Sequence, residues 1–135
     1  MAQAQGLLDI HHQACRQAVH APLPDETGAP FQTKAQTFSA ILCGDFNLET
    51  HDPEYRLLHS DSVPDATRLT DAWRVAHGDR PHAPTFRLFD QRYGPVPISC
   101  DFVFVSEDLR ARVRRVEVNT VTRASDHQPV LLELA

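Results

Sequence analysis

The segment SDHQPV, residues 125–130, runs into the apolar stretch VLL and places a carboxylate beside an imidazole, at Asp126 and His127. Upstream, the segment GDFN, residues 44–47, follows the apolar stretch AILC in a similar way. Short apolar runs bounded by polar residues are typical of buried strands. The end of a strand is a rigid mount for a side chain, so both segments are candidates for a site that binds a metal ion or a phosphate.

A third apolar run, FVFV at residues 102–105, begins directly after Asp101. Each of the three expected strand ends therefore carries an aspartate, and Asn47 and His127 lie beside two of them. Asp45 and Asn47 are two residues apart, so in an extended segment their side chains point to the same face. Together these groups make a hydrolytic metal site the working hypothesis.

The segments GDFN, DFVFVS and SDHQPV, in this order and at these separations, resemble the C-terminal half of the endonuclease/exonuclease/phosphatase family, whose fold is that of deoxyribonuclease I. Thr85 and Phe86 also resemble a threonine-aromatic pair that this family carries between the first two segments. The resemblance covers residues 41–134, and the ordered set is more specific than GDFN alone. It implies an α/β fold: the C-terminal half of a four-layer α/β sandwich, with mostly antiparallel sheet and flanking helices.

The resemblance also implies a role for each catalytic residue. Asp45 would activate water or contact the metal, and Asn47 would orient the reacting groups. Asp101 would hold His127, whose pKa near neutrality suits phosphate stabilisation or acid-base catalysis. The residues implied to bind substrate are Asn47, Thr85 and Phe86.

The implied metal ligands are Asp45 and Asp126. Because these ligands are carboxylate oxygens, Mg²⁺ or Mn²⁺ is favoured over Zn²⁺. The main metal ligand of the family is a glutamate in its N-terminal half, and no such stretch is found in this sequence. We therefore expect the ion to bind weakly to this chain alone. Smaller departures from the family are Ser99, where an arginine is frequent, and Phe102, where a tyrosine is frequent.

Because the N-terminal half of the family has no counterpart in the sequence, we expect residues 1–135 to form a partial domain. It would consist of a helix over residues 1–20, a loop over 21–37 and a sheet region over 38–135 that carries the motifs. Half of a two-sheet sandwich exposes an apolar sheet face and unpaired strand edges. We therefore expect either a homo-oligomer or an N-terminal partner segment.

Two functions remain open at this point. The first is a metal-dependent phosphoester hydrolase, similar to a phosphodiesterase, endonuclease or phosphatase, that acts on nucleic acid or a small phosphoester. The second is a catalytically inactive, truncated module or interaction domain that needs a partner chain. The absent glutamate favours the second function, and the intact motif residues favour the first.

The composition sets further limits. The chain has 13 basic and 18 acidic residues, a net charge of −5, which argues against broad nonspecific adhesion to nucleic acid. It does not exclude a phosphate substrate, because a divalent ion can supply local positive charge. No apolar run approaches the roughly 18 residues of a membrane span. The three cysteines form no CxxC pair, so free thiols and a cytoplasmic location are expected, with Cys43 buried in its apolar run.

Periodicity and turn residues predict the remaining elements. A helix is expected over residues 2–19, and two shorter helical segments over 52–58 and 69–77, the last of them a helix or a turn. Residues 79–100 contain four prolines and are expected to be irregular. Strands are expected over residues 38–43, 102–105, 113–121 and 128–134, with a turn at 107–109.

Overall fold

The computed structural model describes residues 2–20, 37–59 and 68–135. The expected loop over residues 21–37 lies outside the described residues, except for Thr37. The described elements are α1 (Ala2–Val19), β1 (Ile41–Asp45), α2 (Pro53–Leu58), β2 (Leu69–Asp71), α3 (Ala72–His77), β3 (Asp101–Ser106), α4 (Glu107–Arg110), β4 (Val113–Val118) and β5 (Val130–Leu134). Helices mixed with antiparallel strands confirm the expected α/β class.

The strands form two sheets. Strand β3 lies at the centre of a three-stranded sheet of order β1-β3-β2 and is antiparallel to both neighbours. Strands β4 and β5 form a separate antiparallel pair. Because side chains alternate along a strand, β3 sends its two phenylalanines to one face of its sheet and its valines to the other.

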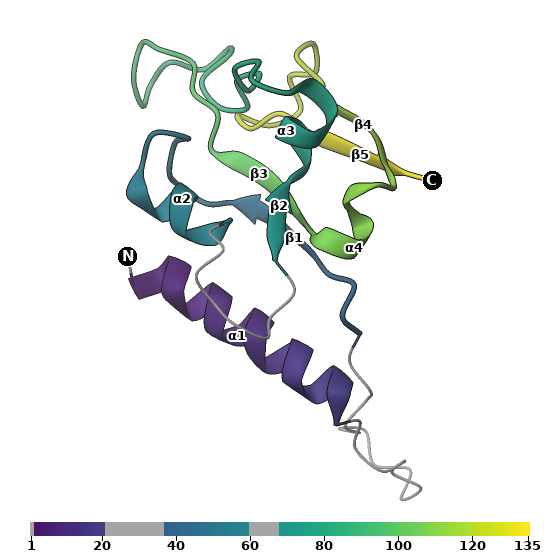
Figure 1. Cartoon of the computed structure of the whole chain (residues 1–135). Coiled ribbons are helices and arrows are strands. Elements are labelled where there is room, and N and C mark those ends of the chain that lie inside the picture. The colour runs from purple at the N-terminus through teal and green to yellow at the C-terminus, as the bar shows by residue number, and fades with distance from the viewer. Residues whose placement is uncertain (1, 21–36, 60–67) are drawn as a thin grey trace, which may run out of the picture.

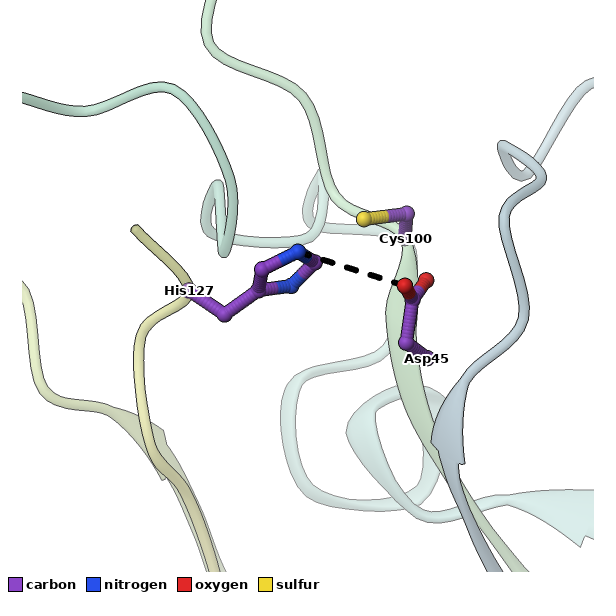
Figure 2. Close-up of side chains that lie close together, drawn as sticks. All are labelled: Asp45, Cys100 and His127. Atoms are coloured by element: carbon purple, nitrogen blue, oxygen red, sulfur yellow. Dashed lines mark ion pairs between the residues drawn. The ribbon is translucent and has the colours of Figure 1, made fainter. Parts of the chain in front are cut away.

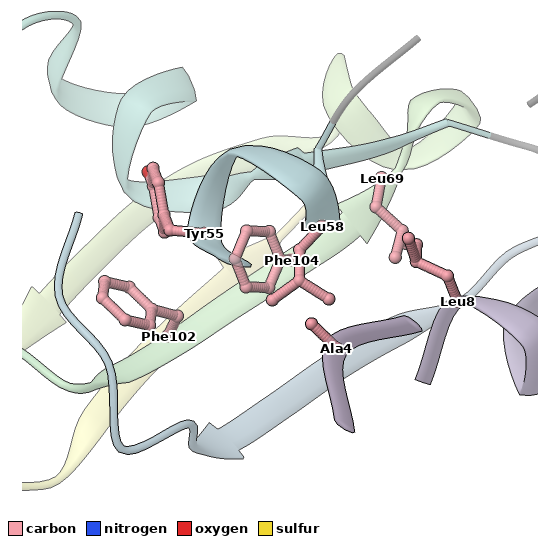
Figure 3. Packing of buried hydrophobic residues seen from close by; sticks show 7 residues of the cluster. All are labelled: Ala4, Leu8, Tyr55, Leu58, Leu69, Phe102 and Phe104. Atoms are coloured by element: carbon pink, nitrogen blue, oxygen red, sulfur yellow. The ribbon is translucent and has the colours of Figure 1, made fainter. Parts of the chain in front are cut away.

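Helices cover the phenylalanine face of β3 (Figures 1 and 3). Phe102 and Phe104 pack there with Tyr55 and Leu58 of α2. Helix α1 adds Ala4 and Leu8, which lie four residues apart and therefore on one side of the helix. This cluster fixes the three-stranded sheet beneath α1 and α2.

The second sheet covers the valine face. Val103 and Val105 pack with Val116 of β4, Ala72 of α3 and Leu109 of α4, and the side chains of β5 border the same cluster. The layers are therefore helices, three-stranded sheet, then two-stranded sheet with α3. None of the helices in residues 2–20, 37–59 and 68–135 is long and apolar enough to span a bilayer.

The structure corrects the expectation of a helix or turn over residues 69–77. Residues Leu69–Asp71 form a strand that pairs with the end of β3, and only Ala72–His77 are helical. The carboxylate of Asp71 accepts a hydrogen bond from Trp73 N at 2.8 Å, so the side chain caps the helix that follows the strand.

The first strand is also less buried than its apolar sequence predicts. β1 spans Ile41–Asp45 rather than residues 38–43, and most of it is exposed. The expectation that Cys43 is buried is therefore wrong: its thiol is free and exposed. The reason is that no segment in the described part of the chain covers β1 on the side that faces β5.

An apolar groove marks this uncovered region. Within the described residues, β1 pairs only with β3, and β5 pairs only with β4, so each strand has one open edge. A groove of about 410 Å³ lies between them, with Ile41 and Cys43 on one side and Val130 and Leu132 on the other. Unpaired edges beside apolar surface are places where another strand adds readily.

Candidate functional site

Two aspartates lie opposite each other on neighbouring strands, at one end of the groove. Asp45 ends β1 and Asp101 begins β3, and the antiparallel register pairs them directly. Like charges opposite each other on neighbouring strands repel, so this pair needs a compensating group. The fold therefore concentrates negative charge at one point of the sheet edge.

The imidazole of His127 bridges these two carboxylates. Its Nδ1 donates to Oδ2 of Asp101 at 2.9 Å, which is the hydrogen bond expected from the sequence. Its Nε2 lies 3.9 Å from Oδ2 of Asp45. The Asp101 bond orients the ring and leaves Nε2 directed toward Asp45 and solvent.

The surrounding charges change the titration of His127. Partial burial lowers the pKa of an imidazole, but here the hydrogen bond to Asp101 and the negative charges of Asp101, Asp45 and Asp126 outweigh it. The net effect raises the pKa of His127 above its usual value. The ring therefore keeps its proton to a higher pH than a histidine in water.

The irregular segment 79–100 holds His127 and Asp101 in place. Thr85 O accepts a hydrogen bond from Gln128 N at 2.7 Å, which ties the segment to the residue after His127. The hydroxyl of Thr85 accepts from the backbone nitrogens of Cys100 and Asp101, each at 3.2 Å. Thr85 is only 1% exposed, so in this structure its side chain positions the backbone. Its assignment to substrate binding stays a prediction.

Phe86 lies against the imidazole. Its ring stacks on that of His127 with 4.5 Å between centroids and 25° between planes. Tyr93, which is 64% exposed, stacks on Phe86 in turn at 6.1 Å. This row of rings gives the site an aromatic border on the side of segment 79–100.

The other predicted residues lie at the margin of this cluster. Asn47 is exposed, with a positive φ of 51°, and its backbone nitrogen donates to Oδ1 of Asp45 at 2.9 Å. Asp126 is exposed and lines a separate shallow pocket with Arg92 and Arg123. Its carboxylate accepts a hydrogen bond from Ser125. The structure thus gathers Asp45, Asp101 and His127 closely, and leaves the metal role of Asp126 a prediction.

Cys100 is a member of the cluster that sequence reasoning missed. One ligand atom each from Asp45, Cys100 and His127 lie within 4.8 Å of one another, and Figure 2 shows the three side chains pointing together. Burial, followed by the charges of Asp101 and Asp45, raises the pKa of the Cys100 thiol to about 12. In the sequence, only the position of Cys100 next to Asp101 could have indicated that it belongs to this cluster.

This arrangement can bind a cation and can move a proton. The carboxylates supply negative charge, His127 supplies a proton or an acceptor near neutral pH, and the aromatic border limits solvent on one side. The sequence profile of the Endonuclease/Exonuclease/phosphatase family matches residues 13–127 of the chain. No curated protein matches the chain.

Proposed function

Because the chain belongs to the endonuclease/exonuclease/phosphatase family, we propose that it is a metal-dependent hydrolase of phosphoesters. The family comprises hydrolases of the nuclease and phosphatase type that generally depend on a divalent metal. The observation that carries the proposal is the bridge formed by His127, with Nδ1 2.9 Å from Asp101 and Nε2 3.9 Å from Asp45.

We propose a task for each residue in and beside this bridge. Asp101 holds the ring and favours its charged form, so that a proton on Nε2 can be donated toward a phosphoryl or leaving-group oxygen. Asp45 accepts a proton from the attacking water or orients it. Phe86 keeps the ring in its plane by stacking, and Asn47 contacts a phosphate oxygen. General acid-base groups of this kind contribute about 10²- to 10⁴-fold to a rate.

The charge of the site supports the proposal that a cation takes part in the reaction. The negative charges of Asp45, Asp101 and Asp126 all act on the imidazole, while a phosphoester is itself an anion. Of the neighbouring arginines, Arg92 is paired with Asp90 at 2.5 Å, and Arg123 stacks over Phe89. A bound divalent ion would neutralise the phosphoryl oxygens.

The described residues do not complete a site for Mg²⁺ by themselves. Mg²⁺ demands near-octahedral oxygen ligation, and the cluster in the described part of the chain offers one carboxylate with a thiol and an imidazole. We therefore propose that Mg²⁺ or Mn²⁺ is held weakly, by Asp45 and Asp126 with water, and that a further carboxylate comes from another segment or chain.

The same segment or chain would cover the apolar groove between β1 and β5. The open edges of both strands border this groove, and Ile41, which lines it, is 50% exposed. We propose that a second copy or an N-terminal partner segment pairs with these edges. A cytoplasmic location is part of the proposal, supported by three free thiols, which suit a reducing compartment.

Hydrolysis of bis-p-nitrophenyl phosphate with Mg²⁺ or Mn²⁺ tests the proposal. We expect turnover that falls about 10²- to 10⁴-fold in His127→Ala. His51→Ala is the matched control, because the side chain of His51 is 73% exposed and contacts only Asp52 at 3.7 Å among the pairs described. Equal rates for the wild type and His127→Ala, or no metal-dependent rate at all, would instead favour the inactive module.

A further inference from the structure

We propose that Asp45, Cys100 and His127 form a binding site for a thiophilic divalent cation of the Zn²⁺ class, distinct in its donor atoms from a magnesium site. One carboxylate oxygen, one sulfur and one ring nitrogen lie within 4.8 Å of one another (Figure 2). A mixed oxygen, sulfur and nitrogen set is typical of Zn²⁺, whereas Mg²⁺ takes oxygen ligands.

The three atoms, all within 4.8 Å of one another, lie somewhat farther apart than in an occupied zinc site. Ligands about 2.0–2.3 Å from a tetrahedral zinc ion lie about 3.3–3.6 Å from one another. His127 Nε2 and Asp45 Oδ2 are 3.9 Å apart, so side-chain rotation alone could bring them to binding distance. Three protein ligands leave the fourth position for water, and the side chains of Asp45 and His127 are 35% and 31% exposed, which gives the ion a path from solvent.

Neighbouring groups already orient two of the ligands. Histidines that bind metals usually donate their other ring nitrogen to a carboxylate, and Nδ1 of His127 donates to Asp101 at 2.9 Å. On Asp45, Oδ1 accepts from the backbone nitrogen of Asn47 at 2.9 Å, which leaves Oδ2 facing His127. Cys100 is 3% exposed and immediately precedes β3, and its thiol donates to Oδ2 of Asp101 at 3.6 Å.

Occupation of this site would inhibit hydrolysis, a consequence that rests on the proposed function. The ion would take Nε2 of His127 and the carboxylate of Asp45, the two groups to which proton transfer is assigned. A low level of a thiophilic cation would therefore switch the enzyme off while Mg²⁺ remains in excess. Removal of Cys100 would weaken this inhibition and leave the magnesium ligands in place.

Titration of the metal-free chain with Co²⁺, followed by displacement with Zn²⁺, tests the site without any need for turnover. We expect a thiolate-to-cobalt charge-transfer band in the wild type that is absent in Cys100→Ser. In Asp45→Asn and His127→Ala the Zn²⁺ affinity should fall by more than about 10-fold. Asp45 and His127 are partly exposed, so these two variants decide the question if Cys100→Ser does not fold, as judged by circular dichroism.

Two control variants separate this site from the other thiols. Cys43→Ser removes an exposed thiol, and Cys15→Ser removes the sulfur that lies 3.8 Å from Nε2 of His11. Both should keep the band. Absence of a band in the wild type, its persistence in Cys100→Ser or its loss in Cys15→Ser would overturn the proposal. A band without phosphoester hydrolysis would support the metal site and count against the proposed function alone.

Discussion

Nδ1 of His127 lies 2.9 Å from Oδ2 of Asp101, a residue 26 positions earlier in the chain and at the start of the central strand β3. The contact joins the start of β3 to the segment that precedes β5, so it depends on the packing of one sheet against the other. It also places a titratable ring between two carboxylates. Several properties of the chain should therefore respond to changes at this one contact.

Asp101→Asn should lower the pKa of His127. Burial lowers the pKa of the ring, and the hydrogen bond to Asp101 and the charge of Asp101 are the largest effects that raise it. The ring proton signals of His127, followed by NMR against pH in the presence of a chelator, measure the change. Asp126→Asn, which acts through charge alone, should lower the pKa less. An unchanged pKa in Asp101→Asn would mean that the bond does not form in solution.

Much of this site was predictable from the sequence, because its polar residues close or open apolar runs. The runs before Asp45 and after Asp101 become β1 and β3, and His127 lies just before β5. The order of these three segments also identified the family, which the profile match confirms. The local sequence pattern was sufficient to predict these three residues because each of them lies at or near the end of a strand.

Other features depended on contacts that the sequence does not display. Strand β2 has three residues, too few to show alternation, and it exists because Leu69, Thr70 and Asp71 pair with the end of β3. Cys43 lies in an apolar run that predicts burial, but its exposure depends on what covers β1. Cys100 joins the cluster because the chain entering β3 passes beside His127, a tertiary relation.

Thr85→Val should destabilise the fold. The hydroxyl of Thr85 accepts from the backbone nitrogens of Cys100 and Asp101, and valine has a similar shape without the acceptor. An unsatisfied buried donor costs about 1–3 kcal/mol, which urea unfolding would measure. Thr85→Ser keeps the oxygen and should lose only about 1 kcal/mol for the missing methyl group. If valine and serine cost the same, the two hydrogen bonds contribute nothing.

Asp71 should make the stability of the chain sensitive to acid. Burial raises the pKa of this carboxyl, but the hydrogen bond and charge of His82 and the hydrogen bond from Tyr55 outweigh it and hold the pKa below its usual value. A carboxyl with a depressed pKa in the folded state stabilises the fold above its unfolded pKa, about 3.9, and this stabilisation is lost as the pH falls through the folded value.

Asp71→Asn tests this origin of acid sensitivity. His82 and Asp71 are almost fully buried and 2.7 Å apart, so loss of the carboxylate should cost about 3 kcal/mol at neutral pH. The free energy of unfolding of the variant should also change less between pH 5 and pH 3, as measured with urea. Asp79→Asn, an exposed change, should leave the pH dependence of the wild type intact. Identical pH dependence in Asp71→Asn would assign the acid sensitivity to other carboxyls.

Mg²⁺ should bind the chain weakly. Asp45 is the one carboxylate in the cluster of possible ligands that the described residues form, and Mg²⁺ loses its water shell reluctantly. Calorimetry should give a millimolar Kd or weaker, about −4 kcal/mol or less favourable. Asp45→Asn should remove the remaining signal. A micromolar Kd for this chain alone would show that further ligands are present.

The chain should self-associate through its open strand edges. Apolar surface left in water costs about 25 cal/mol per Å², and Ile41 is 50% exposed on a strand that has one unpaired edge within the described residues. Sedimentation equilibrium should therefore show dimers or larger species at micromolar concentrations.

Ile41→Lys should shift the chain to monomer, because a charged side chain disfavours the pairing of an edge strand. Val121→Lys, at a residue that is 80% exposed outside any strand, should not. A cooperatively folding monomer in the wild type would mean that the chain shields this groove by itself, and the partner proposal would then be wrong.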